Sequence, residues 1–367
     1  MATSVSESAR RLRDSLARVP RDVFERHVAA AEVVDLPAQV PPWTVTGVAL
    51  AEGDSFTLFA EGRVVLSEEA GLWNGAALHL WARVGGRGPL LNGTRDTYGF
   101  RAPSSGALEL GIYQGEWRNE DGDLDTPREL YEALGGGLAV LVVRWRGEAR
   151  AGVEALARAV PEEPLFAAES ARLARPIEKP AGWEYLWFLG PADIYRAARF
   201  DGTAAISAET RDDVGILRRP VRVPLRDDTR LRWRWRVHDL PSAVAEDQLV
   251  THDYLSIALE LDNGQDLTWY WSSTLPAETC FRCPLPHWDQ RETHLVVRSG
   301  ASGIGKWHDE ERSVVRDYET AVRTDAPPPR EIVAVWLIAV SVFQKCSGAV
   351  DFAAIEIASE AGRTVVL

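Results

Sequence analysis

The sequence predicts a mostly β protein built from two jelly-roll or β-sandwich domains, with helices at the N-terminus and between the domains. Three observations predict this class. Short alternating polar and apolar runs recur along both halves of the 367-residue chain, with Gly, Asp and Ser turns between them. Helical and strand patterns do not alternate, which argues against a doubly wound parallel sheet. A proline-containing segment, residues 176–182, divides the chain.

Residues 1–40 are expected to form a helical arm. Apolar residues recur there at helical spacing, at Leu12, Leu16, Val23, Phe24 and Val28. Pro20 splits this pattern into two short helices within residues 5–32. An apolar stripe on such helices favours docking, either on the rest of the chain or on a second copy in a homo-oligomer.

Residues 41–147 are expected to form the first β-sandwich. Strand patterns cover residues 55–60, 78–83, 108–113 and 138–145. One helix is expected to interrupt them, because Thr126 can cap it, Pro127 suits its first turn and Glu129 follows three residues after the cap. Short strands with frequent turns are typical of an antiparallel sandwich.

Residues 148–182 are expected to be a connector that is helical up to residue 175 and ends in the linker. A second, jelly-roll-like sandwich is expected over residues 183–367. Its strand patterns cover residues 204–207, 230–237, 255–261, 267–272, 293–298, 332–342 and 350–357. A helix is expected over residues 309–322.

Composition narrows the functional classes. The net charge of −13 argues against nucleic-acid or anionic-membrane partners, which need clustered positive charge. No apolar run is long enough to span a bilayer and no secretory leader is evident, so a cytoplasmic location is expected. Three cysteines cannot form a disulfide framework. No glycine-rich phosphate-binding motif occurs, so no nucleotide cofactor is expected.

An acidic loop follows the strand pattern at 108–113 and supplies oxygen ligands of the kind that calcium prefers. Its candidate metal ligands are Glu116, Asn119, Asp121, Asp123 and Asp125. Alternating acids around Gly122 can bind one ion from several sides. The alternative is a solvated acidic turn in which Asp125 caps the next helix.

Residues 42–146 resemble the calcium-dependent galactophilic lectin family of bacteria typified by LecA (PA-IL). The resemblance is carried by residues 52–62, Trp73 and residues 106–113. It implies a small jelly-roll sandwich with a calcium loop directly after the strand at 108–113, where sugar hydroxyls would complete the coordination. The family's Asn-Asp pair after the tyrosine is replaced by Gln114-Gly115. Its galactose-contacting His and Gln have no counterpart around residues 74–79.

The second domain carries aromatic and acidic residues that suggest an aromatic cleft. Nine of the 14 tryptophans lie at or after Trp183. Residues 231–237 alternate Leu, Trp, Trp and Val with three arginines, which predicts a half-buried strand. Trp269-Tyr270-Trp271 would put large rings on both faces of one strand, so the second face needs a loop, a partner or a ligand to cover it.

We predict that this cleft binds a ligand in domain two. The candidate catalytic residues are Asp253, Glu311, Asp317, Tyr270 and Tyr318, and the candidate ligand-binding residues are Trp235, Trp271, Trp307 and Arg312. Desolvated carboxyls could act as acid or base, and the tyrosines could donate or orient protons. The alternative is that a loop or the helix at 309–322 seals the face.

Residues 182–357 resemble a bacterial domain family that carries only an unknown-function label, number 3047. The resemblance is carried by Trp-x-Trp-x-Val at 233–237, Asp253, Tyr270-Trp271 and the run from Gly305 to Tyr318. It implies a domain boundary and no reaction.

Cysteine and histidine ligand types occur together in one segment, at Cys280, Cys283, His287 and His294. Zinc uses these ligands, but three residues between the two pairs is cramped for a structural finger. A redox pair or ordinary thiols in a loop are the alternatives.

Three functional hypotheses follow. The first is binding of a carbohydrate-like or small organic ligand in the aromatic cleft of domain two, beside a lectin-like first domain. The second is an enzyme of specialised metabolism, of cyclase or lyase type, that uses the acids in that cavity. The third is a structural or oligomerisation module.

Overall fold

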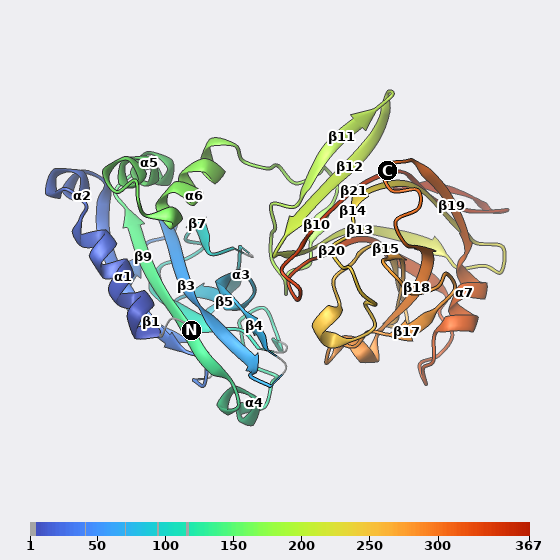
Figure 1. The fold of residues 1–367 in the computed structure, drawn as a ribbon, viewed down its shortest axis with the longest axis horizontal. Helices are drawn as coiled ribbons and strands as arrows, with labels where there is room; N and C mark the ends of the chain where they lie inside the picture. The colour runs from blue at the N-terminus through green and yellow to red at the C-terminus, as the bar shows by residue number, and fades with distance from the viewer. Residues whose placement is uncertain (1–4, 41, 70, 94, 115–116) are drawn as a thin grey trace. The chain divides into compact units, whose positions relative to one another are not determined.

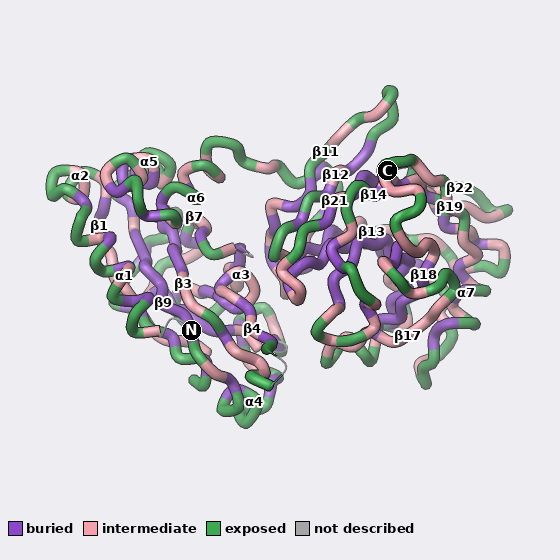
Figure 2. Tube along the Cα trace, in the orientation of Figure 1, coloured by how far each residue is buried: buried purple, intermediate pink, exposed green. Residues whose placement is uncertain are grey.

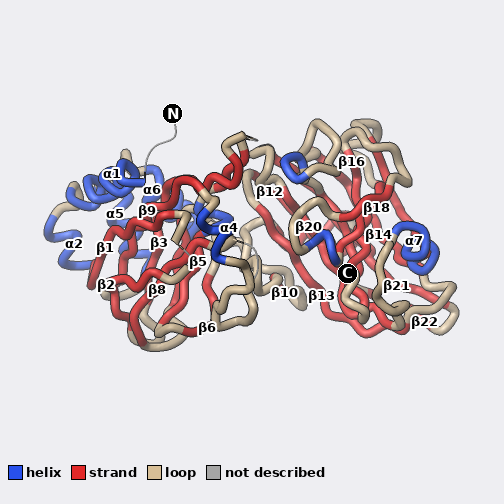
Figure 3. Tube along the Cα trace, turned by 90° about the horizontal axis from the view of Figure 1, so that it is seen from below, coloured by secondary structure: helices blue, strands red, loops and turns tan. Residues whose placement is uncertain are grey.

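The computed structural model describes residues 5–40, 42–69, 71–93, 95–114 and 117–367. The mostly β prediction is confirmed, since the described residues are 46% strand and 18% helix (Figure 3). The chain divides into two compact units, residues 1–176 and 177–367. Among the described residues, no helix is both long and apolar enough to cross a membrane.

The first unit is a sandwich of two sheets. The five-stranded sheet has the order β1-β9-β3-β4, with β7 also paired to β3, and the four-stranded sheet has the order β2-β8-β5-β6. Their strands are β1 (Val28–Pro37), β2 (Thr44–Leu50), β3 (Ser55–Ser67), β4 (Leu72–Asn74), β5 (Leu80–Val84), β6 (Arg87–Leu91), β7 (Thr97–Arg101), β8 (Gly106–Ile112) and β9 (Gly135–Trp145). Leu58, Leu110 and Val140 belong to the core between the sheets.

Helices cover the outer face of the five-stranded sheet (Figure 1). The helices of this unit are α1 (Val5–Ala17), α2 (Arg21–His27), α3 (Ala76–His79), α4 (Arg128–Glu132), α5 (Ala149–Ala159) and α6 (Pro164–Ala174). Leu12 of α1, Leu156 of α5 and Phe166 of α6 pack with Leu141 of β9 in one apolar cluster. The outer face of β9 is therefore buried as fully as its inner face, which explains the continuous apolar run of this strand.

Three sequence-based assignments are corrected here. Residues 28–37 form strand β1 instead of completing a helical arm, because they pair along β9. Residues 76–79 form helix α3, so the strand expected from residue 78 begins at Leu80. Residues 308–313 form strand β19 (His308–Ser313) because they pair with β14 (Arg230–Asp239), and the helix expected over 309–322 is the shorter α7 (Val314–Ala321).

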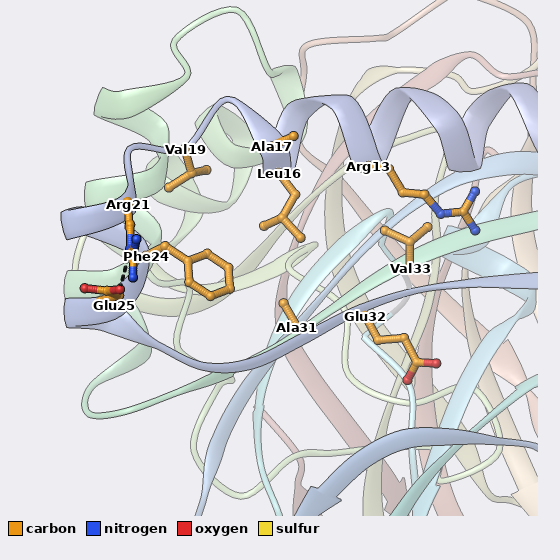
Figure 4. Close-up of a pocket in the computed structure, with 10 residues that line it drawn as sticks. All are labelled: Arg13, Leu16, Ala17, Val19, Arg21, Phe24, Glu25, Ala31, Glu32 and Val33. Carbon is orange, nitrogen blue, oxygen red and sulfur yellow. Dashed lines mark hydrogen bonds and ion pairs between the residues drawn. The ribbon is translucent and has the colours of Figure 1, made fainter.

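A groove of about 580 Å³ lies between the N-terminal helices and β1. Figure 4 shows Leu16 and Phe24 directed toward Ala31 and Val33 of β1. Leu12 is fully buried in this chain's own core. The apolar stripe of the N-terminal helices is therefore largely used within one chain, and self-association through them stays a prediction.

The second unit is also a two-sheet sandwich. A seven-stranded sheet has the order β10-β13-β20-β15-β16-β18-β17, and a six-stranded sheet has the order β11-β12-β21-β14-β19, with β22 paired to β21. The remaining strands are β10 (Glu184–Tyr185), β11 (Tyr195–Phe200), β12 (Thr203–Arg211), β13 (Val214–Pro224), β15 (Leu255–Leu261), β16 (Asp266–Ser272), β17 (Cys280–Arg282), β18 (Glu292–Ser299), β20 (Glu331–Val340), β21 (Ser347–Ser359) and β22 (Gly362–Val365). Two short 3-10 helices, η1 (Leu249–Thr251) and η2 (Trp288–Gln290), lie in the loops.

The core of the second unit lies between its two sheets and is rich in tryptophan. Figure 2 shows the central strands of the unit buried. Trp233 and Trp235 of β14 face Trp269 and Trp271 of β16 across this core, with ring centroids 6.2 and 5.9 Å apart in the two facing pairs. Four large rings in one layer bury much apolar area, which stabilises the sandwich.

Candidate functional site

The two faces of β14 have different surroundings, as the alternation of apolar residues and arginines in this strand predicts. Trp235 is fully buried in the core, and the indole N–H of Trp235 donates to Glu310 Oε1 at 3.0 Å. Trp271 is also in the core and donates to the Gly300 carbonyl. Two predicted ligand-binding tryptophans therefore pack inside the sandwich, because alternation directs them inward.

The other face of the six-stranded sheet carries a polar cluster centred on Asp351 of β21. Its carboxylate accepts hydrogen bonds from Ser207 Oγ at 2.5 Å and from Arg236 Nη2 at 2.7 Å. His238 Nε2 lies 2.7 Å from Asp351 Oδ2. Burial alone would raise the pKa of Asp351, but these three partners hold it below its ordinary value. The carboxylate is therefore a fixed, charged acceptor.

Two aromatic rings flank this polar group. The guanidinium of Arg236 lies 4.7 Å from the ring centre of Phe200 and 4.8 Å from that of Trp307. The two rings meet edge to face at 5.5 Å, and Arg234 also lies over the Trp307 ring. We call Phe200, Ser207, Arg236, His238, Trp307 and Asp351 the outer-face cluster. Trp307 is half-buried, so part of its surface stays accessible.

Asp253 is fully buried and supports a loop. Its carboxylate accepts the backbone N–H groups of Phe343 at 3.0 Å and of Gln344 at 2.6 Å. Burial raises the pKa of Asp253, and these two hydrogen bonds partly oppose that rise. The contacts anchor the turn after β20, so the sequence-predicted catalytic acid has a structural role in this position.

Buried Asp317 and half-buried Arg312 form an ion pair at the start of α7. Arg312 Nε and Nη2 donate to the two Asp317 oxygens at 2.7 and 2.9 Å. Arg312 also binds Glu278 with Nη1 and Nη2. The remaining predicted residues lie elsewhere: Glu311 is half-exposed and paired with Arg232, and the Tyr318 hydroxyl accepts from Asn263.

Tyr270 points to the opposite face of β16 from Trp269 and Trp271, as the alternation predicts. It is fully buried there against Tyr254, Phe281 and His294. Burial, reinforced by the nearby Glu246 carboxylate, raises the pKa of Tyr270 well above its ordinary value. Segments of this same chain, before β15 and around β17, thus supply the cover that the second face requires.

The structure does not bring the nine sequence-predicted catalytic and ligand-binding residues into one cleft. Trp235 and Trp271 lie inside the sandwich, Tyr270 lies beyond the seven-stranded sheet, and Trp307 lies beyond the six-stranded sheet. The prediction of a common pocket is corrected for a simple reason. Pairing register and alternation place residues on different faces even when they are near in sequence.

The acidic loop of the first unit uses its carboxylates within the protein. Asn119 donates to Asp123 Oδ2 at 2.9 Å, Asp121 accepts the Gly88 N–H, and Asp125 pairs with Arg118. Four of the five predicted calcium ligands are described, and Glu116 lies outside the described residues. Asn119 and Asp123 bind each other, while Asp121 and Asp125 bind other groups, so calcium binding would need rearrangement and stays a prediction.

A buried cluster of metal-ligand types lies on the second face of the seven-stranded sheet. Ligand atoms of His252, Cys283 and His294 lie within 4.8 Å of one another, and all three residues are buried. Burial, together with the neighbouring His294, lowers the pKa of His252 to about 3, and burial raises that of the Cys283 thiol. Both groups are thus neutral near pH 7 in the absence of an ion.

The sequence-based zinc interpretation found two members of this cluster and missed the third. Cys283 and His294 are in it, whereas Cys280 packs against the core on the other side and His287 is exposed. His252 lies 31 positions before Cys283, in the loop after η1, and no local spacing signals it.

The chain is thus a protein of two β-sandwich units, the second of which contains these buried polar groups. Within it, residues 181–356 match the model of a family described as a protein of unknown function (DUF3047), as the resemblance of the second domain implied. No curated protein matches the chain.

Solved structures similar to the chain include two carbohydrate-related domains. One is the N-terminal domain of EclA, a PllA-like lectin, with 21% identity over 33% of this chain and 98% of that chain, and a TM-score of 0.25. The other is the xyloglucanase domain of NopAA, a type three effector from Sinorhizobium fredii, in complex with cellobiose. Its identity is 7% over 50% of this chain and 95% of that chain, with a TM-score of 0.29. At these scores neither likeness supports an argument about a site.

Proposed function

We propose that the second unit binds a carbohydrate-like ligand at the outer-face cluster. The observation that carries the proposal is the half-buried Trp307 ring beside a network of fixed polar side chains. A sugar has an apolar C–H face and a rim of hydroxyls. An aromatic ring can stack on the former, while oriented donors and acceptors bind the latter.

The polar side chains of the cluster suit this task because they are already ordered. The contacts of Arg236 with Asp351 use two of the five guanidinium donors. His238 is 42% exposed at its side chain and is held by the same carboxylate. Because these groups are positioned before a ligand arrives, binding would cost less ordering entropy.

Binding is favoured over catalysis because the predicted catalytic carboxyls have other roles. Asp253 anchors a turn and Asp317 holds Arg312. Glu311 lies on the six-stranded sheet, in an exposed ion pair. A general acid or base must reach the reacting atoms, and each of these carboxyls is already bound to another group of the protein.

A glycan array probed with the full chain, with and without calcium, tests the proposal. We expect glycan binding that Trp307→Ala weakens at least about tenfold, since stacked aromatics carry much binding energy. Trp187→Ala is the matched control, because Trp187 is 41% exposed in the same unit and outside the cluster. Absence of binding to any glycan, or equal binding by Trp307→Ala and the parent, would contradict the proposal.

A further inference from the structure

A second site lies apart from the outer-face cluster, on the far side of the seven-stranded sheet. Three segments meet there: the loop after η1 brings His252, the residue after β17 is Cys283, and β18 brings His294. All three side chains are buried, with exposures of at most 1%. From this geometry we propose that they hold a transition-metal ion of the zinc class.

The separation of the His252 and Cys283 ligand atoms fits a tetrahedral ion closely. The His294 ligand atom fits it less closely. With the usual Zn–N and Zn–S bond lengths, neighbouring ligand atoms in a tetrahedron lie roughly 3.4–3.6 Å apart. His252 Nε2 and Cys283 Sγ are 3.4 Å apart, and the set of three lies within 4.8 Å. A small shift of the His294 ring therefore completes the arrangement.

His252 is oriented as a metal ligand. Its Nδ1 lies 2.6 Å from the Glu246 carbonyl oxygen. A carbonyl only accepts hydrogen bonds, so Nδ1 carries the proton and the Nε2 lone pair faces the Cys283 sulfur. Metal-ligating histidines commonly use this backbone contact to fix the ring and its tautomer.

His294 provides the second, independent observation. It is fully buried, and neither of its ring nitrogens has a hydrogen-bond partner. Its Nε2 lies 3.6 Å from Glu292 Oε2, too far for a hydrogen bond. A buried imidazole without hydrogen bonds costs free energy, and such groups in native proteins commonly mark an ion or an ordered water. Phe281 stacks on the ring with centroids 5.0 Å apart and Tyr254 packs at its edge, so aromatic side chains fix the plane of the ring.

The ligand set indicates which kind of ion fits. One thiolate and two neutral imidazoles suit zinc, whereas calcium and magnesium prefer oxygen ligands. Binding would release the Cys283 proton to solvent. The resulting charge of one thiolate and a divalent ion is offset by Glu292, whose Oε2 lies 3.6 Å from His294 Nε2. We assign Glu292 a positioning role, in which it accepts a hydrogen bond from the His294 ring.

An ion at this point would tie the loop after η1 to the end of β17 and to β18. His252 and Cys283 belong to the segments that cover the second face, and His294 belongs to the sheet itself. A structural metal stabilises the folded state because the unfolded chain has no preformed site. The ion would thus stabilise the segments that cover Tyr270 and its neighbours.

Cobalt substitution of the purified full chain tests the site. We expect about one equivalent of zinc per chain by mass spectrometry after purification, and a thiolate-to-cobalt charge-transfer band in the near ultraviolet when Co²⁺ replaces it. Cys283→Ser should abolish the band. Cys280→Ser and Cys346→Ser are the matched controls and should keep it, since neither thiol is in the cluster.

A further variant distinguishes metal binding from a simple hydrogen bond between the Cys283 thiol and His252. Glu292→Gln should weaken zinc affinity about 10- to 100-fold, which a thiol donating to His252 would not explain. If Cys283→Ser does not fold, the parent protein still decides the matter. A parent chain that binds neither zinc nor cobalt, or a cobalt band that depends on Cys280 and not on Cys283, would overturn the proposal.

Discussion

The indole N–H of Trp269 donates a hydrogen bond of 2.8 Å to Asp317 Oδ2, linking the tryptophan core of the second unit to helix α7. The same carboxylate binds Arg312 through two nitrogens. One buried acid thus accepts a hydrogen bond from a core donor that would be unpaired without it and also binds Arg312, which explains why an acid occupies this position.

Replacement of Asp317 by alanine should therefore destabilise the second unit. We expect a loss of about 1–3 kcal/mol in the free energy of unfolding, because the Trp269 indole loses its acceptor in a buried site. Urea unfolding followed by tryptophan fluorescence measures it. Asp309→Ala serves as control and should change stability by less than about 0.5 kcal/mol, because that side chain is 83% exposed. Equal stability of the two variants would contradict this account.

Asp253→Ala should loosen the turn at residues 343–344. Two backbone N–H groups lose their acceptor, so we expect a loss of about 1–3 kcal/mol in the free energy of unfolding. Asp253→Asn keeps one acceptor oxygen and should cost less. Thermal unfolding ranks the variants, and hydrogen exchange at Gln344 should rise most in the alanine variant. A catalytic role would instead leave stability unchanged and remove an activity.

Because the pKa of Asp351 is lowered in the folded protein, we predict that the free energy of unfolding of the second unit falls at acid pH. Its folded pKa lies below the ordinary value of 3.8 because Ser207, His238 and Arg236 bind the charged form. The stabilisation is therefore fully present above the ordinary pKa and is lost as the pH falls through the lower folded pKa. Urea unfolding across about pH 2 to 6 should show this slope, and Asp351→Asn should flatten it. Asp309→Asn should keep the parent slope.

Calcium at the acidic loop of the first unit is tested by thermal unfolding. If the loop binds the ion, millimolar calcium should raise the melting temperature by ligand linkage, and a chelator should reverse the rise. Asp123→Asn should remove the effect, because Asp123 is one of the proposed ligands. Calcium would have to displace the Asn119–Asp123 and Arg118–Asp125 contacts. No shift at millimolar calcium would reject the site.

If the chain self-associates through its N-terminal helices, we expect the contact to lie at the groove beside β1. A second copy covering Leu16, Phe24 and Val33 would bury their remaining exposed area. We expect light scattering to give a mass above that of one chain, and Phe24→Glu to reduce it. Asp22→Asn is the control on the same helix, because Asp22 is exposed and does not line the groove. A parent chain that scatters as a monomer at all concentrations would rule out this contact.

The amino-acid pattern was sufficient for the fold class and for most strands. Alternation in β14 and β16 correctly separated the inward tryptophans from the arginines and from Tyr270, because side-chain direction in a strand has a period of two. A short helix near Pro127 and a helical connector were also expected, although Pro127 is the N-cap of the short helix and the side chain of Thr126 does not cap it. These features depend on neighbours in sequence, so one chain is enough to predict them.

Tertiary structure alone decided which residues meet. Residues 28–37 contain helix-favouring alanines, yet pairing with β9 makes them a strand, because tertiary contacts outweigh weak local propensity. The residues that were predicted to line one cleft lie in three separate places in the second unit. The cluster of His252, Cys283 and His294 joins a loop, the end of one strand and the middle of another. Such a site arises from the register of distant strands, which no local spacing in the sequence encodes.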